Sequence, residues 1–163
     1  MAKNKEEKTN VMRVLEQKKI AYTPHSYPHE EGVAVDGVTV AKSMGFDPAI
    51  VFKTLVARGA SKQYYVFDVP VAENLDLKKA AKAVGEKSIE MIHQKELLPL
   101  TGYVHGGCSP VGMKKLFPTV FHETAENLET MIVSAGKIGY QVELSPRDLA
   151  ALVRAKFADI IVE

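Results

Sequence analysis

The chain has 163 residues, of which 46% are apolar and 25% charged, proportions that are ordinary for a soluble globular protein. No apolar run approaches the roughly 20 residues that a membrane-spanning helix needs, and the charged N-terminus lacks the apolar segment of a secretory signal. A formal net charge of +1 gives no general attraction to nucleic acid, so any such contact has to come from a local basic patch.

The length and the cysteine content of the chain limit the number of domains and disulfides that it can form. We expect one domain over residues 1–163, with the polar residues 1–8 as a disordered tail. The single cysteine, Cys108, excludes an internal disulfide, as is usual in the reducing cytoplasm. A cytoplasmic location without membrane contact follows as an expectation.

The first half of the chain alternates helical and strand patterns. Thr9 is a good helix N-cap, Gly45 and Gly85 stand where helices end, and the run 49–58 is rich in β-branched and apolar residues. The predicted elements are a helix at 10–19, a proline-broken strand within 20–32, a helix at 38–45, a hairpin of strands at 49–58 and 62–71, and a helix at 74–85.

The second half is richer in strands and holds a glycine loop, "TGYVHGGCSPVG", at 101–112. Ser145, Pro146 and Asp148 together form a good helix start. The predicted elements are a strand at 87–92, a helical turn at 94–100 that Pro99 stops, strands at 119–124 and 129–136, a return strand at 137–144, and a helix at 147–160 that closes the chain.

These elements amount to six or seven strands and four or five helices. The strands are not separated by one helix each, so the pattern disfavours a doubly wound parallel sheet. We expect an α+β fold in which helices flank a mixed, barrel-like sheet.

Lys53 is a charged residue inside the apolar strand "IVFKTLV", where it shares a face with Val51 and Leu55. One interpretation is an edge-strand lysine that discourages aggregation, and the strand alone favours it. The other is a cation in a cleft, which would hold a phosphate, a carboxylate or a developing oxyanion.

The glycine loop lacks the spacing of a P-loop or of a dinucleotide-binding fingerprint, so no nucleotide cofactor is implied. It is either a tight connection between strands or a nest of N–H groups for an anion or oxyanion. Lys114 and Lys115 follow directly and favour a phosphate nearby.

Cys108 and the histidines give little support to a nucleophile or a metal site. His105 precedes Cys108 by three residues, a spacing that does not place a base beside the thiol, and no third orienting group is visible. We expect neither metal nor cofactor, because no histidine pair has metal-ligand spacing backed by cysteine or carboxylate. The histidines are His25, His29, His93, His105 and His122.

Two further patterns have a structural and a functional interpretation. In "VSAGKIG", Ser134 either binds a ligand or caps the turn at Gly136, and the turn is favoured. A lysine run on one predicted helix and its exit is usually a solvated face, but it can contact a nucleic-acid backbone. The run consists of Lys78, Lys79, Lys82 and Lys87.

Several motifs, taken in order, resemble the YbaK/EbsC family of free-standing deacylases, relatives of the editing domain of bacterial prolyl-tRNA synthetases. The resemblance runs from about Tyr22 to the C-terminus and rests on "VFKTLV", "LDLKKAAKAVG", "KSIEMI", "LTGYVHGGCSPVGMKK", "FPT" and "VSAGKIG". It implies a mixed, barrel-like sheet flanked by helices. It also implies hydrolysis of the ester between tRNA(Pro) and a wrong amino acid, usually cysteine.

The resemblance also implies roles for individual residues. The catalytic lysine of the family motif falls on Lys53, and the catalytic backbone of the glycine loop falls on Gly106 and Gly107. Many relatives carry a pocket phenylalanine where this chain has Val35 or Asp36, and some carry an aspartate where it has Gln141. Substrate-binding roles fall on Tyr27, Thr54, Ser134, Gly136 and Gln141.

For cysteinyl-tRNA, the substrate thiol can attack the ester carbonyl, so that the protein supplies only positioning and oxyanion stabilisation. We expect the acceptor end of tRNA(Pro) as the partner, with prolyl-tRNA synthetase as a source of tRNA identity. Three alternatives stay open: an Ala-tRNA(Pro) deacylase, a binding module without turnover, and a small-molecule hydrolase with Cys108 as nucleophile. The candidate tRNA-contacting residues are Lys78, Lys79, Lys82, Lys114 and Lys115.

Overall fold

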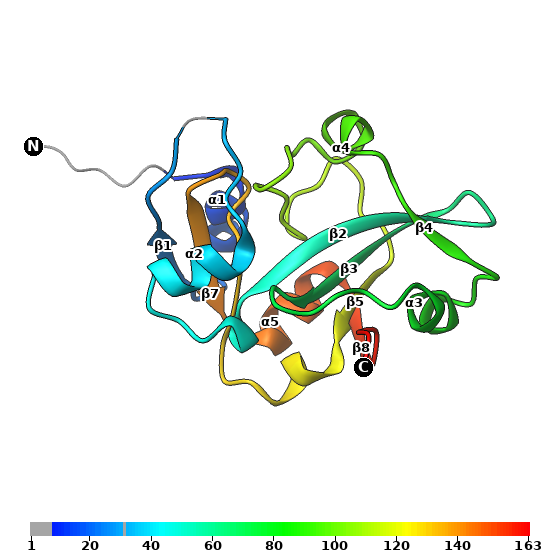
Figure 1. The fold of residues 1–163 in the computed structure, drawn as a ribbon. Helices are drawn as coiled ribbons and strands as arrows, with labels where there is room; N and C mark the ends of the chain where they lie inside the picture. The colour runs from blue at the N-terminus through cyan, green and yellow to red at the C-terminus, as the bar shows by residue number, and fades with distance from the viewer. Residues whose placement is uncertain (1–7, 31) are drawn as a thin grey trace, which may run out of the picture.

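The computed structural model describes residues 8–30 and 32–163, whose strands form two separate sheets (Figure 1). The larger sheet has five strands in the order β4-β2-β3-β5-β8, and the smaller has three in the order β1-β7-β6. The predicted tail at 1–8 lies outside the described residues except for Lys8, whose Nζ is 2.9 Å from Glu16 Oε1.

The larger sheet is built on the predicted hairpin. β2 (Phe52–Gly59) and β3 (Tyr64–Pro70) pair antiparallel, and β4 (Ile89–Met91) pairs antiparallel with the last part of β2. β5 (Thr119–His122) runs parallel to β3, and β8 (Ala155–Ala158) runs parallel to β5. The sheet is therefore mixed, as the sequence predicts.

The smaller sheet contains the predicted return strand. β6 (Met131–Ser134) and β7 (Tyr140–Leu144) pair antiparallel, and β1 (Thr23–Ser26) pairs antiparallel with β7. A single bridge between Val51 and Ile132 connects the start of β2 with β6. The two sheets thus meet at the N-terminal end of β2.

The helices begin and end close to the predicted signals. The Thr9 hydroxyl accepts the Met12 N–H at 3.3 Å, the Ser145 hydroxyl accepts the Asp148 N–H at 3.3 Å, and Gly85 has a φ of 76°. The helices are α1 (Asn10–Gln17), α2 (Gly37–Ser43), α3 (Leu77–Val84), α4 (Gln94–Thr101) and α5 (Pro146–Val153), with short 3₁₀ helices at Pro48–Ile50 and Glu123–Asn127. In Figure 1, α1 and α2 lie beside the smaller sheet, and α3 lies beside the larger.

The prediction of a barrel-like sheet is wrong, because neither sheet formed by the described residues is closed. β4 and β8 are the two edges of the larger sheet, and the number of described strands is eight rather than six or seven. Closure would need the first and last strands to pair, whereas here β8 pairs on one side only, with β5.

The predicted C-terminal helix is also too long. α5 ends at Val153, where Arg154 adopts a left-handed conformation with a φ of 59°, and the chain then pairs as β8. At α4 the difference is opposite: the helix continues past Pro99 to Thr101. A proline removes one helical hydrogen bond, and tertiary contacts of Leu97 and Leu100 with the core stabilise this short helix.

The core lies on both faces of the larger sheet. Phe52 and Val56 of β2 pack into the main cluster, with α1, α5, the glycine loop and the smaller sheet, whereas Ala57 and Leu55 pack towards α3. Burial on both faces explains why apolar residues of β2 occur on both faces rather than on one. No helix within the described ranges is long and apolar enough to cross a membrane.

Candidate active site

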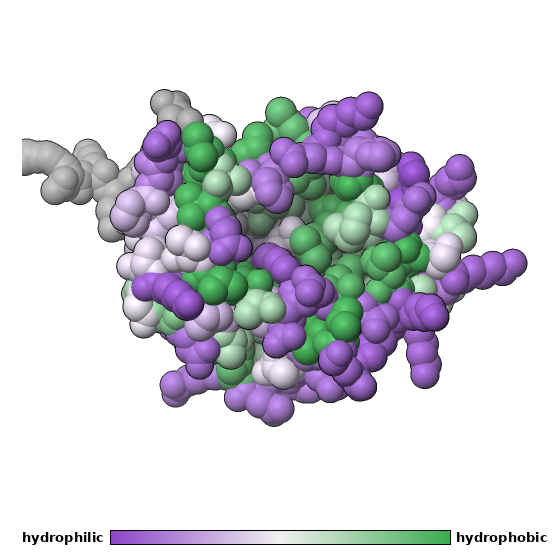
Figure 2. Space-filling model, in the orientation of Figure 1, coloured by the Kyte–Doolittle hydropathy of each residue, from purple (hydrophilic) through white to green (hydrophobic). Residues whose placement is uncertain are grey.

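A cavity of about 340 Å³ is lined by residues of both sheets, of α2 and α4, and of the glycine loop. Figure 2 shows a hollow near the centre of this face of the molecule. The cavity brings together residues from several distant parts of the sequence. Among those predicted for the site, its lining includes Tyr27, Lys53, Thr54, Gly106 and Gln141.

Lys53 reaches the cavity from β2, and its side chain is partly buried. Burial lowers the pKa of Lys53, while the negative charges of Asp36 and Glu73 act in the opposite direction. No hydrogen bond or ion pair joins its ammonium to another described residue. This placement supports a cation in a cleft rather than an edge-strand lysine.

The same part of β2 presents an open backbone edge. β4 pairs only with Ala57–Gly59 and the bridge to β6 lies at Val51, so among the described strands none pairs with Thr54 on this side of β2. The Val56 carbonyl accepts the Ile92 N–H at 3.4 Å on this side, and because peptide groups alternate along a strand, those of Thr54 point the same way. The N–H and C=O groups of Thr54, a residue of the cavity lining, are therefore not paired with a neighbouring described strand.

The glycine loop turns at Gly106, whose φ of 90° is a conformation that glycine adopts readily. The Gly107 N–H donates to the Val104 carbonyl at 3.0 Å, which closes the turn. The N–H of Gly107 is therefore already used, and it is Gly106 that lines the cavity. Of the two glycines predicted to supply N–H groups to the nest, Gly106 is therefore the one that remains a candidate.

Tyr27 and Gln141 form part of the wall on the side of the smaller sheet. Tyr27 follows β1 and is buried, and its N–H donates to the Gly139 carbonyl at 3.0 Å. Gln141 lies opposite His25 on one neighbouring strand and Ser134 on the other. Its Oε1 atom is buried without a hydrogen-bond partner among the described residues. A buried acceptor of this kind is suited to a polar ligand in the cavity.

Ser134 and Gly136, in contrast, form a turn. The Ser134 hydroxyl accepts the Gly136 N–H at 3.2 Å, and Gly136 has a φ of 94°. Neither residue is part of the cavity lining. The structure therefore favours the turn for this motif over direct substrate binding.

Cys108 lines the cavity but lacks the properties of a nucleophile. Burial raises the pKa of its thiol to about 12, and the charge of Asp68 acts in the same direction. A reactive cysteine needs a lowered pKa. His105 also lines the cavity, yet no described hydrogen bond joins it to Cys108. In the described ranges, no group of three metal-ligating side chains comes together.

Two charged residues near the cavity did not receive a role from the sequence. Asp36 caps α2 by accepting the Thr39 N–H at 3.1 Å and the Thr39 hydroxyl at 3.0 Å. These two hydrogen bonds, with the charge of Lys53, lower the pKa of Asp36. The sequence "DGVT" is typical of a helix N-terminus, so the capping role of this aspartate could have been predicted. The second is Asp68, a carboxylate inside the apolar strand "YYVFDVP".

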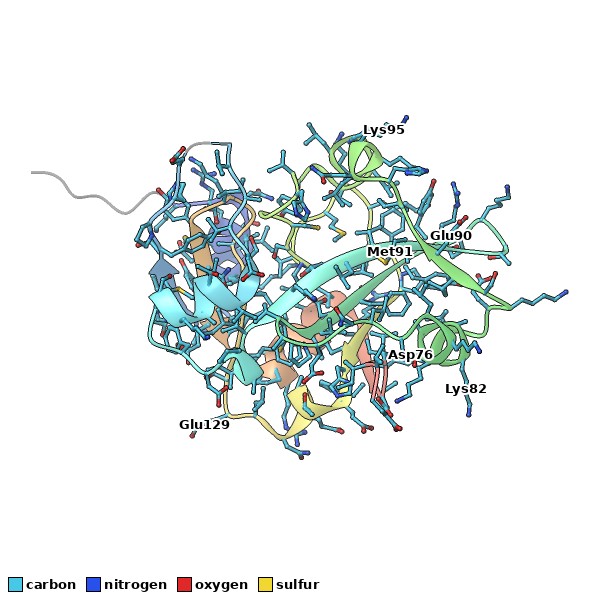
Figure 3. All side chains as sticks on the ribbon, viewed as in Figure 1. Asp76, Lys82, Glu90, Met91, Lys95 and Glu129 are labelled. Atoms are coloured by element: carbon cyan, nitrogen blue, oxygen red, sulfur yellow. The ribbon has the colours of Figure 1, made fainter. Side chains whose placement is uncertain are left out.

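The predicted tRNA-contacting lysines differ in their surroundings. Lys79 Nζ is held by Asp159 at 3.0 Å, Glu163 at 3.4 Å and the Ile161 carbonyl at 3.0 Å. Lys78 and Lys82 instead line a groove of about 390 Å³, and Figure 3 shows the Lys82 side chain pointing away from the protein. The groove also includes Lys87, Ser88 and Glu86, whose carboxylate accepts hydrogen bonds from the Ser61 and Tyr65 hydroxyls.

The two lysines after the glycine loop have partners nearby. Lys114 Nζ donates to the Pro99 carbonyl at 3.3 Å, and Lys115 Nζ lies 5.9 Å from the centre of the Phe117 ring. Both remain exposed.

The fold and the cavity agree with comparisons to known proteins. Residues 32–152 match the family described as the aminoacyl-tRNA editing domain, and the chain belongs to this family. It is 45% identical over 161 residues to an Enterococcus faecalis protein named as a candidate Cys-tRNA(Pro)/Cys-tRNA(Cys) deacylase, EbsC, and the match covers 98% of each chain.

Solved structures show the same fold. A structure described as a candidate trans-editing enzyme for prolyl-tRNA synthetase matches with a TM-score of 0.79 at 25% identity, over 94% of this chain and 95% of that one. The hypothetical protein APE2540 matches with a TM-score of 0.82 at 20% identity, over 93% and 99% of the two chains, which supports the fold alone.

Proposed function

We propose that this protein is an aminoacyl-tRNA deacylase that removes cysteine from misacylated tRNA(Pro). The observation that carries the proposal is the cavity, whose described lining contains a lysine without a described partner and backbone groups, but no activated nucleophile. The name of the 45% identical relative supports cysteine as the amino acid. Prolyl-tRNA synthetase would supply tRNA identity, because the cavity is large enough only for the acceptor end.

The reaction needs no nucleophile from the protein if the substrate supplies one. The cysteinyl thiol attacks the ester carbonyl carbon, the bond to the ribose 3′ oxygen breaks, and the amino acid leaves as a cyclic thioester that water opens. Lys53 and the Gly106 N–H would stabilise the oxyanion that forms on the carbonyl, and the cavity wall would hold the ester in place.

Three substrates test the proposal: Cys-tRNA(Pro), the same substrate with its thiol alkylated, and Ala-tRNA(Pro). We expect rapid deacylation of the first and at least 100-fold slower loss from the second, because alkylation removes the nucleophile. Alanine is the close alternative, because one methyl or thiol group is worth only about 1–3 kcal/mol of discrimination between substrates. Faster hydrolysis of Ala-tRNA(Pro) than of Cys-tRNA(Pro) would contradict cysteine as the amino acid removed. Tight binding of these aminoacyl-tRNAs without any turnover would favour the alternative function of a binding module.

The lysines of α3 provide a test of the tRNA surface. We propose that the groove of Lys78, Lys82 and Lys87 contacts the phosphate backbone of the acceptor stem. The double substitution Lys78→Gln/Lys82→Gln is expected to raise KM for Cys-tRNA(Pro) about tenfold with little change in kcat. It should also reduce the slope of log(kcat/KM) against log[salt] by about 1–2.

Lys79→Gln is the matched control on the same helix. Because Lys79 is neutralised by Asp159 and Glu163, its loss should change KM less than about twofold, although it removes contacts with the C-terminal segment. An equal effect of the Lys79 substitution and of the double substitution would contradict a specific role for the groove.

A further inference from the structure

A carboxyl group lies behind the cavity wall, and the proposed reaction does not yet use it. Asp68 of β3 stands directly opposite Thr54 of β2 in the strand register. Its side chain is fully buried, and its Oδ1 atom accepts a hydrogen bond from the Thr54 hydroxyl. Its Oδ2 atom has no partner among the described residues. A buried carboxyl with one hydrogen bond is costly to keep, so its presence calls for a reason.

The surroundings of Asp68 are almost entirely apolar. On β2 its neighbours on the same face are Thr54 and Val56, and on β5 it lies opposite the buried Phe121. From the glycine loop, Cys108 is the titratable group close enough for the charge of Asp68 to raise its thiol pKa. Burial raises the pKa of Asp68 itself to about 7, against the opposing effect of the Thr54 hydrogen bond.

Thr54 connects this buried carboxyl with the cavity. Its side chain lies on the core face of β2 with Asp68, and the residue is also part of the cavity lining. As long as Asp68 is ionised, the hydroxyl proton of Thr54 is directed at Oδ1. The oxygen lone pairs of Thr54 are then free to accept a proton from a group in the cavity.

We propose that Thr54 and Asp68 form a proton-accepting pair for deacylation, in which Thr54 contacts the substrate thiol and Asp68 is a positioning residue behind it. The inference rests on the proposed function. As the sulfur forms its bond with the carbonyl carbon, the S–H proton moves to Thr54 Oγ1, and the Thr54 hydroxyl proton moves to Asp68 Oδ1. When the ester C–O bond breaks, the same two transfers in reverse return a proton to the ribose 3′ oxygen, so that both groups are restored.

A purely structural pair would look the same in a static structure, so the test needs a readout that packing does not change. Single-turnover deacylation of Cys-tRNA(Pro) is measured from pH 5.5 to 8.5, with the spontaneous loss subtracted at each pH. The wild type is expected to show an inflection near pH 7 that reports the ionisation of Asp68, in addition to that of the substrate thiol.

Asp68→Asn retains the size of the side chain and an oxygen that can accept from Thr54, but it cannot take up a proton. We expect this variant to lose the inflection near pH 7 and to react at least tenfold more slowly at pH 7.5, with KM within about twofold of the wild type. The inflection of the substrate thiol remains in both proteins as an internal reference.

Substitutions at Thr54 provide a second test that holds if Asp68→Asn does not fold. Thr54→Val removes the hydroxyl at constant shape, whereas Thr54→Ser keeps it. The valine variant should lose at least tenfold in rate, and the serine variant should stay within about threefold of the wild type. Melting temperatures of all the variants report on folding.

The outcomes separate this inference from the proposed function. If the wild type does not deacylate Cys-tRNA(Pro), the proposed function is wrong and the inference falls with it. If the wild type is active but Asp68→Asn retains its rate and its pH profile, only the inference is overturned. Equal rates of the valine and serine variants at Thr54 would overturn it in the same way.

Discussion

Lys53→Ala is expected to lower kcat/KM for Cys-tRNA(Pro) at least 100-fold, a loss of about 2.7 kcal/mol of transition-state stabilisation. The ammonium is partly buried at the cavity and has no hydrogen-bond or ion-pair partner among the described residues, so its charge is available to the substrate. The same burial disfavours the charged form, which means that alanine should not destabilise the fold. Single-turnover kinetics and chemical denaturation measure the two effects separately.

Lys42→Ala is the control for a general loss of positive charge. Lys42 lies in the last turn of α2 and is exposed, and it is not part of the cavity lining. We expect its substitution to change kcat/KM less than about threefold. Full activity of Lys53→Ala would remove Lys53 from the mechanism. Weaker binding of tRNA without any turnover in the wild type would favour the binding module.

Much of the fold follows from local signals in the sequence. The hairpin of β2 and β3, the ends of α1 and α3, and the start of α5 are each marked by an apolar run, a capping side chain or a glycine. β8 could not be predicted in this way, because its sequence "AKFA" continues the helical pattern of α5 and becomes a strand only by pairing with β5. The open sheet likewise depends on pairing between distant strands.

For the candidate site, the sequence identified some residues correctly but not which of their atoms are available to a substrate. A lysine inside an apolar strand identified Lys53, and the same signal, applied to a carboxylate, marks Asp68, whose relation to Thr54 appears only in the strand register. For Ser134 the structure has the turn that the motif alone favours, whereas for Gly107 the motif did not reveal that a turn hydrogen bond already uses the N–H. Motifs identify residues near a site, whereas the hydrogen bonds of the folded chain decide which atoms remain available.

Gly106→Ala is expected to lower kcat at least 30-fold, because it affects the one loop glycine that lines the cavity. An alanine at a φ of 90° is strained, and its Cβ would lie 2.7 Å from Ala34 Cβ and 3.2 Å from Ala34 Cα. Either the loop or the segment before α2 has to move, and both form the cavity wall. The Gly106 N–H then leaves the position from which it would stabilise the oxyanion.

Gly102→Ala separates this displacement from backbone strain. Gly102 has nearly the same φ, 89°, but a Cβ there would approach only the Lys114 side chain, at 3.4 Å. Both variants should lose about 1–2 kcal/mol of unfolding free energy, while Gly102→Ala should keep kcat within about threefold. The double substitution Gly106→Ala/Ala34→Gly removes the closest contact and should recover part of kcat. If Gly102→Ala lost as much activity as Gly106→Ala, the effect would come from strain in the loop and not from the position of the Gly106 N–H.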